Sequence, residues 1–126
     1  MAANIEVKIE ANNIEKIKAA CAEQVSAALE AIGMQAENYA KKELERPKAH
    51  ADGMIRPNID TSRLVNSITH AVENGDTAIV GTNVEYAAYV EIGTQKSQPY
   101  PYLEPAVKNH IDEYKRMFEY VLQNGN

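Results

Sequence analysis

The sequence has no tryptophan, one phenylalanine and one cysteine, Cys21. A single thiol excludes an internal disulfide, so the fold has to rest on packing. No apolar run approaches the ~20 residues of a membrane-spanning helix. The first residues have neither the basic nor the apolar segment of a secretory signal. We therefore expect a protein without a membrane span that is synthesised in the cytoplasm.

Basic residues are also few: 13 Lys and Arg stand against 18 Asp and Glu, giving a net charge of −5. Proteins that bind nucleic acid without regard to sequence rely mainly on Lys and Arg to neutralise phosphates. No stretch of the chain forms a basic stripe, so we expect no nucleic-acid binding. At 126 residues the chain is expected to form a single domain, residues 1–126.

The residues that carry chemistry are scattered. His50, His70 and His110 do not stand at metal-ligand spacing, and no glycine-rich phosphate loop is present. We expect no metal, no cofactor and no catalytic site. The alternative is a small hydrolase using Glu85, Glu91 and His70. Against it, Glu85 and Glu91 are six residues apart, and on a helix that spacing turns by about 600°. Their side chains would therefore face different sides.

The first part of the chain predicts a strand and a long helix. Apolar and polar residues alternate over residues 5–10, as in a strand with one wet face. Asn12 and Asn13 can cap a helix, and apolar residues then recur every three or four positions to about Glu45. Unbroken, this helix would be about 50 Å long. We therefore expect part of it to project, or to bury its apolar stripe against another subunit.

The middle of the chain predicts a loop, a helical turn and a hairpin. Residues 46–58 contain three Pro or Gly residues and read as a mobile loop. Asp60 can cap a short helical turn that runs to about Val65. Two β-branched runs, residues 67–73 and 76–81, flank Asn74-Gly75, a strong signal for a hairpin turn. The strand at residues 5–10 is the natural third member of this sheet.

The last part predicts two helices joined by a loop with two prolines. Residues 85–92 suit a short helix that Gly93 stops, and residues 103–122 suit a C-terminal helix. The predicted fold class is α+β. It comprises a long N-terminal helix, a small antiparallel sheet, and a short helix and C-terminal helix packed on that sheet.

Tyrosines concentrate around the short helix, and we consider them candidates for a contact surface. Two of them stand three apart on that helix and share a face. Two more alternate along the proline-containing loop. Tyrosine is enriched at interaction hot spots, but the same side chains would also fill a core. Both readings stay open, and the candidate interface residues are Tyr86, Tyr89, Glu91, Tyr100 and Tyr102.

Three segments in order resemble the minor tail-component family of long-tailed bacteriophages, whose genes lie among the head–tail joining genes. They are DTSRLVNSI at residues 60–68, VGTNVEYAAYVEIGT at residues 80–94 and PYLEPA at residues 101–106. The resemblance covers about Asp60 to the C-terminus, and the long N-terminal helix also fits it. The chain departs from the family at Ser62, where glycine is more common, and at Ala88, where proline is more common.

The resemblance implies a non-enzymatic structural protein of a phage or prophage virion. It implies a place at the head–tail junction, in tail completion, head–tail joining or tail termination. Other neck and tail proteins would be its partners, and relatives there are thought to form rings, often of six subunits. The protein would be found in the virion, and in the host cytoplasm during assembly. The alternative outside this family is a cytoplasmic adaptor or antitoxin-like binding module.

Overall fold

The computed structural model describes residues 5–10, 22–46, 61–96 and 98–124. The predicted loop at 46–58 falls almost wholly outside the described residues. So do the predicted caps Asn12, Asn13 and Asp60. The elements are, in chain order, β1 (Ile5–Glu10), α1 (Ala22–Glu45), α2 (Thr61–Ser67), β2 (Thr69–Glu73), β3 (Thr77–Thr82), α3 (Ala87–Ile92), α4 (Glu104–Lys108) and α5 (Ile111–Asn124). The predicted α+β class is confirmed.

The three strands form one antiparallel sheet in the order β1-β3-β2. Val80 in the central strand lies opposite Val7 on one side and His70 on the other. The hairpin turn has φ of 57° at Asn74 and 75° at Gly75. Positive φ at both central residues is what a type I′ turn requires. The predicted hairpin and third strand are therefore both confirmed.

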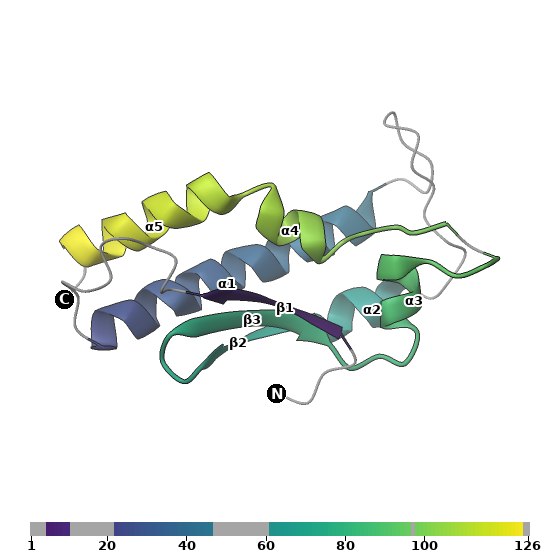
Figure 1. The fold of residues 1–126 in the computed structure, drawn as a ribbon, viewed down its shortest axis with the longest axis horizontal. Helices are drawn as coiled ribbons and strands as arrows, with labels where there is room; N and C mark the ends of the chain where they lie inside the picture. Colours follow the sequence, from purple (N-terminus) through teal and green to yellow (C-terminus); the bar gives the residue numbers. More distant parts are fainter. Residues whose placement is uncertain (1–4, 11–21, 47–60, 97, 125–126) are drawn as a thin grey trace.

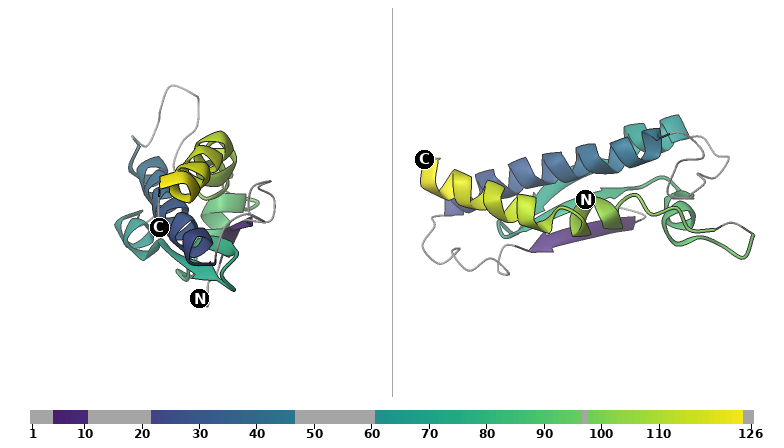
Figure 2. Two further views of the ribbon diagram at one scale, coloured as in Figure 1. Left: turned by 90° about the vertical axis from the view of Figure 1, so that its left-hand side faces the viewer. Right: turned by 90° about the horizontal axis from the view of Figure 1, so that it is seen from above.

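Helix α1 lies between the sheet and α5, as Figures 1 and 2 show. The described part of α1 buries its apolar stripe within the chain, against β2 and β3 on one side and α4 and α5 on the other. For these residues the expected contact with another subunit is wrong, because the chain's own layers cover both sides of the helix. The buried residues are Val25, Ala28, Leu29, Ile32, Gly33, Ala36, Ala40 and Leu44.

The predicted C-terminal helix is two helices, so the expectation of one continuous helix over 103–122 is wrong. The first ends at Lys108, and the N–H of Asn109, its C-cap, donates to the Pro105 carbonyl at 3.1 Å. The ring of His110 stacks on Tyr39 of α1, with centroids 3.6 Å apart and planes within 4°. The Tyr39 hydroxyl also donates to the Glu113 carboxylate at 2.5 Å. These contacts hold the start of α5 against α1, and asparagine is a weak helix former that permits the break.

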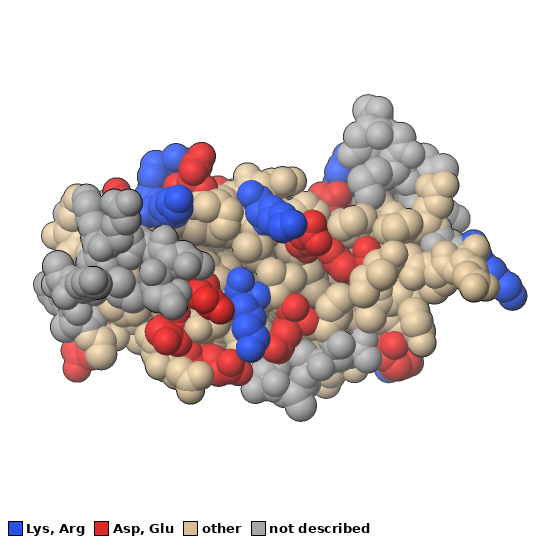
Figure 3. All heavy atoms as spheres, in the orientation of Figure 1, with Lys and Arg blue, Asp and Glu red and all other residues tan. Residues whose placement is uncertain are grey.

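The surface carries charges of both signs. On the face shown in Figure 3, acidic and basic side chains are interspersed rather than gathered by sign. No helix within the described ranges is long and apolar enough to cross a membrane.

Candidate functional site

Helix α3 presents two large apolar side chains to solvent. Tyr89 is 64% exposed and Ile92 is 67% exposed. Residues three apart on a helix are neighbours on one face, so the two form one patch. We call Tyr89 and Ile92 the α3 patch. Helix α3 lies at the end of the molecule opposite the C-terminus of α5 (Figure 1).

Ile92 was not among the residues singled out from the sequence. Its spacing of three from Tyr89 was the available signal, but a position next to Gly93 reads first as a helix end. Exposed large apolar groups that gather in one place are typical of surfaces that bind other proteins.

Glu91, between the two patch residues, points into the protein and is only 8% exposed. Its Oε1 accepts the backbone N–H groups of Tyr102 at 3.0 Å and Leu103 at 2.8 Å, and its Oε2 accepts that of Glu104 at 3.1 Å. These N–H groups lie at the start of α4, where a helix leaves its amides without internal partners. We call this set of bonds the Glu91 clamp. It makes Glu91 a structural link between α3 and α4, with its carboxylate inside the protein.

Tyr100 and Tyr102 are fully buried within the chain. The Tyr102 hydroxyl donates to the Ala87 carbonyl at 2.9 Å, and the Tyr100 hydroxyl donates to the Glu43 carbonyl at 2.9 Å. The sequence left open whether these two tyrosines belong to the core or to a contact surface. In the structure both rings lie in the core. Both sit in the core because the loop turns them inward, where the backbone N–H of Tyr100 also bonds the Val90 carbonyl at 2.8 Å.

Gly93 ends α3, as the sequence predicts. Its φ is +86°, in the left-handed region that favours glycine. Its N–H donates to the Tyr89 carbonyl at 2.8 Å. A Cβ at this position would lie 2.7 Å from the nitrogen of Pro99. Both the backbone conformation and the close approach of the loop therefore require glycine here.

Tyr86 is held against α2 and offers less surface than Tyr89. It is half-buried, and the guanidinium of Arg63 lies 5.7 Å from its ring centroid. Arg63 also forms two parallel hydrogen bonds to Glu85, at 2.7 and 2.9 Å. The hydrogen bonds from Arg63 lower the pKa of the Glu85 carboxyl. Arg63 thus joins α2 to the turn before α3.

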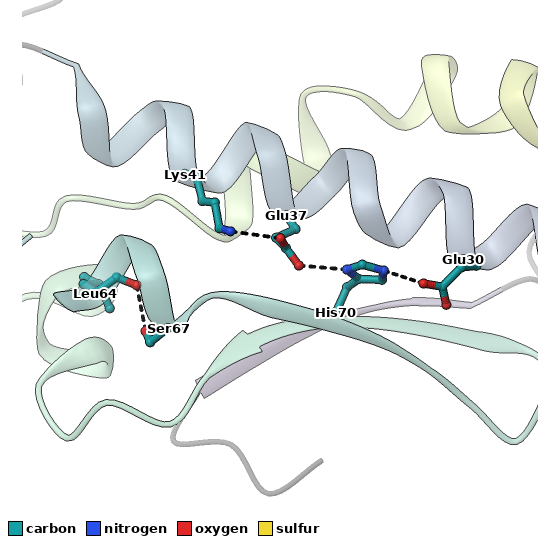
Figure 4. Close-up of polar contacts among 6 residues, drawn as sticks. All are labelled: Glu30, Glu37, Lys41, Leu64, Ser67 and His70. Atoms are coloured by element: carbon teal, nitrogen blue, oxygen red, sulfur yellow. Dashed lines mark hydrogen bonds and ion pairs between the residues drawn. The ribbon is translucent and has the colours of Figure 1, made fainter. Parts of the chain in front are cut away.

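His70, the base of the alternative hydrolase, lies between two carboxylates of α1 (Figure 4). Its Nδ1 is 2.8 Å from Oε1 of Glu37, and its Nε2 is 2.6 Å from Oε1 of Glu30. Lys41 completes the row with an ion pair to Glu37 at 3.0 Å. Burial lowers the pKa of His70, but the bonds to Glu37 and Glu30 outweigh it, and the net pKa is raised above 6.5. We call this group the α1–β2 clasp.

The three proposed hydrolase groups therefore have separate partners. Glu85 binds Arg63, Glu91 binds the start of α4, and His70 binds α1. Both ring nitrogens of His70 are occupied by carboxylates, so neither is presented to a substrate. The geometry favours structural roles for all three residues.

Comparison with known proteins gives a match to a bacteriophage family. The chain matches the family model HK97-gp10_like, described as "Bacteriophage HK97-gp10, putative tail-component", over residues 11–93. No curated protein and no solved structure matches it. The matched range holds the first two segments of the resemblance up to Gly93, whereas the segment at 101–106 lies beyond it. Since the match covers well over half of the sequence, the chain belongs to the HK97-gp10-like family and is a structural tail component of a bacteriophage.

Proposed function

We propose that this tail component acts at the head–tail junction, in tail completion, head–tail joining or tail termination. It works there by contact with other neck and tail proteins and not by catalysis. Family membership supports a structural role in the virion. The single observation that carries the contact is the α3 patch, with Tyr89 64% and Ile92 67% exposed at one end of the molecule.

The α3 patch is suited to binding because it is held in place before a partner arrives. The Glu91 clamp fixes α3 to the start of α4, and Arg63 fixes the preceding turn to α2. A preorganised surface loses less conformational entropy on binding. Tyrosine offers a large contact area together with a hydroxyl that can form a hydrogen bond, and it is enriched at interaction hot spots. Tyr86 extends the surface toward α2.

The proposed assembly is a ring of identical subunits. Heterologous contacts, in which one surface binds a different surface of the next copy, close into a ring when the rotation permits. The α3 patch supplies one of those two surfaces. Because it lies at the end of the molecule, it can reach a neighbour without a change of fold (Figure 1).

The test is complementation of a phage that lacks this gene. Without the protein, we expect electron microscopy to show separate heads and tails or unfinished tails. Wild-type protein should restore joined particles, and Tyr89→Ala should not. The matched control is Tyr120→Ala, since Tyr120 on α5 is 68% exposed and has the same side chain. It should restore particles like the wild type.

The outcomes test the junction role and the α3 patch separately. Normal numbers of joined, infectious particles without the gene would overturn the junction role. Full rescue by Tyr89→Ala would overturn the assignment of the α3 patch while leaving the junction role standing. Circular dichroism of each purified variant checks that the exposed substitutions leave the fold intact.

A further inference from the structure

Strand β1 is an edge strand of the sheet that the described residues form. It pairs with β3 along its whole length, and the described residues place no strand on its other side. The outer side of an edge strand carries backbone N–H and C=O groups that can pair with a strand of another chain. We propose that β1 pairs antiparallel with β1 of a second copy, so that two sheets join across a two-fold axis. This proposal describes an association of the free protein, and it depends neither on the junction role nor on the ring, whose heterologous contacts differ from a two-fold pairing.

The residues of β1 alternate strictly in character, as IEVKIE. Ile5, Val7 and Ile9 contact the core on the side of the helices. Glu6, Lys8 and Glu10 therefore lie on the opposite face, because successive side chains of a strand point to opposite sides. Opposite residues of an antiparallel pair share a face of the sheet. The possible registers of the β1–β1 pair are therefore those that place apolar residues opposite apolar residues. A shift by one residue would place carboxylates of the second copy on the face that packs against the helices.

Charge selects among those registers. Centring the axis on Lys8 sets Lys8 opposite its own copy, and like charges directly opposite each other are destabilising. Centring it on Val7 sets Glu6 opposite Lys8 of the second copy, twice by symmetry. Ile5 then lies opposite Ile9 of the second copy. Centring on Ile9 pairs Lys8 with Glu10 but leaves the first part of β1 without a partner. The Val7 register therefore pairs opposite charges on one face and apolar residues on the other, over a longer stretch of β1 than the Ile9 register.

A hollow beside β1 suits the apolar face of the added strand. It has a volume of about 120 Å³ and lies between β1 and the helices α4 and α5. Its apolar walls include Ile111, which is 38% exposed. In the Val7 register, Ile5 of the second copy lies next to Ile9, which also lines the hollow. The residues around it are Lys8, Ile9, Glu10, Val107, Ile111, Tyr114 and Lys115.

A charge swap tests the pairing. In purified Lys8→Glu protein, Glu6 faces a glutamate of the second copy. In Glu6→Lys protein, lysine faces Lys8. We expect sedimentation equilibrium to show a dimer for the wild type and roughly tenfold weaker association for each variant alone. An equimolar mixture of the two variants restores Glu–Lys pairs at both positions and should form a mixed dimer.

Controls keep folding and association apart. The in-chain ion pairs of Lys8 with Glu6 and Glu73 are long, at 3.9 and 3.7 Å, and partly exposed. Exposed pairs contribute little to stability, so both variants should keep the wild-type unfolding temperature. Lys96→Glu makes the same charge change on an exposed loop and should dimerise like the wild type.

Three results would overturn the proposal. One is a wild-type protein that stays monomeric up to hundreds of micromolar. Another is a dimer that neither variant weakens. The third is a mixture that associates no better than its components. Dimerisation retained by Glu6→Lys but lost by Lys8→Glu would contradict the Val7 register and point to the Ile9 register.

Discussion

The carboxylate of Glu91 accepts the backbone N–H of Leu103 at 2.8 Å, joining a residue of α3 to the residue just before α4. With its bonds to Tyr102 and Glu104, this one side chain satisfies amides that the helix itself leaves free. The charge also suits the position, because the N-terminus of a helix favours an anion.

Glu91→Gln should therefore destabilise the protein. The glutamine keeps one acceptor oxygen but turns an NH₂ group toward amide donors. We expect a loss of about 1–3 kcal/mol in the free energy of unfolding, measured with urea. Glu104→Gln is the matched control, since its exposed carboxylate forms a surface ion pair with Lys108, whose loss should matter little. Equal stability of the two variants would contradict the Glu91 clamp.

Tyr102 is expected to act through stability and not through contact with a partner. Tyr102→Phe removes the bond to the Ala87 carbonyl and should cost about 0.5–1.5 kcal/mol. Tyr102→Ala also leaves a cavity in the core and should cost about 3–5 kcal/mol. Thermal unfolding of both variants measures these losses. An alanine variant as stable as the wild type would show that the ring is not part of the core.

The α1–β2 clasp predicts a pH dependence. Protonated His70 donates to both Glu37 and Glu30, whereas the neutral ring has only one N–H to donate. The folded pKa is raised above 6.5, so the contribution of His70 to stability is fully present below pH 6.5. It is lost as the pH rises through the folded pKa.

Urea unfolding of the wild type and of His70→Gln at a series of pH values measures that contribution directly. The difference between the two free energies should shrink as the pH rises, and Glu30→Gln should reduce the effect by removing one acceptor. NMR titration of the imidazole locates the folded pKa, and a value below 6.5 would refute the sign of the shift.

Gly33 makes room for His70. A Cβ at this position would lie 3.0 Å from Cδ2 of His70, and the ring is held by carboxylates at both nitrogens. Gly33→Ala should therefore destabilise the protein, although alanine in a helix is favoured by about 1 kcal/mol over glycine. In a His70→Gly background both the ring and the Cβ of residue 70, which would lie 3.3 Å away, are gone, and the same substitution should stabilise. A double-mutant cycle measures this reversal of sign; equal effects in both backgrounds would contradict it.

The parts of the fold that sequence predicts are those fixed by neighbours in the chain. The turn at Asn74-Gly75 is set by two residues that tolerate positive φ. The end of α3 is set by one glycine. Strand β1 shows its two faces in its own alternation, and the hydrophobic spacing of α1 shows its buried stripe.

The parts that sequence does not predict depend on residues distant along the chain. The break before α5 involves the stack of His110 on Tyr39, far upstream in α1. Tyr89 and Tyr102 look alike in the sequence, yet one is exposed and the other fills the core. The difference arises because the proline-containing loop folds back onto α3, and such a loop has no periodicity that shows which side chains point inward.

The loop after Gly93 is closed at its base from both sides. The Glu91 clamp holds residues 102–104, which follow the loop, against α3. The Tyr100 N–H also donates to the Val90 carbonyl of α3. Its length is therefore uncoupled from the positions of α3 and α4. A short epitope or fluorophore tag inserted after Lys96 would therefore lengthen this loop and leave the bonds between α3 and residues 100–104 in place. The bonds that close the loop come from Val90, Glu91 and residues 100–104, so the closure itself does not depend on the side chains of residues 94–96.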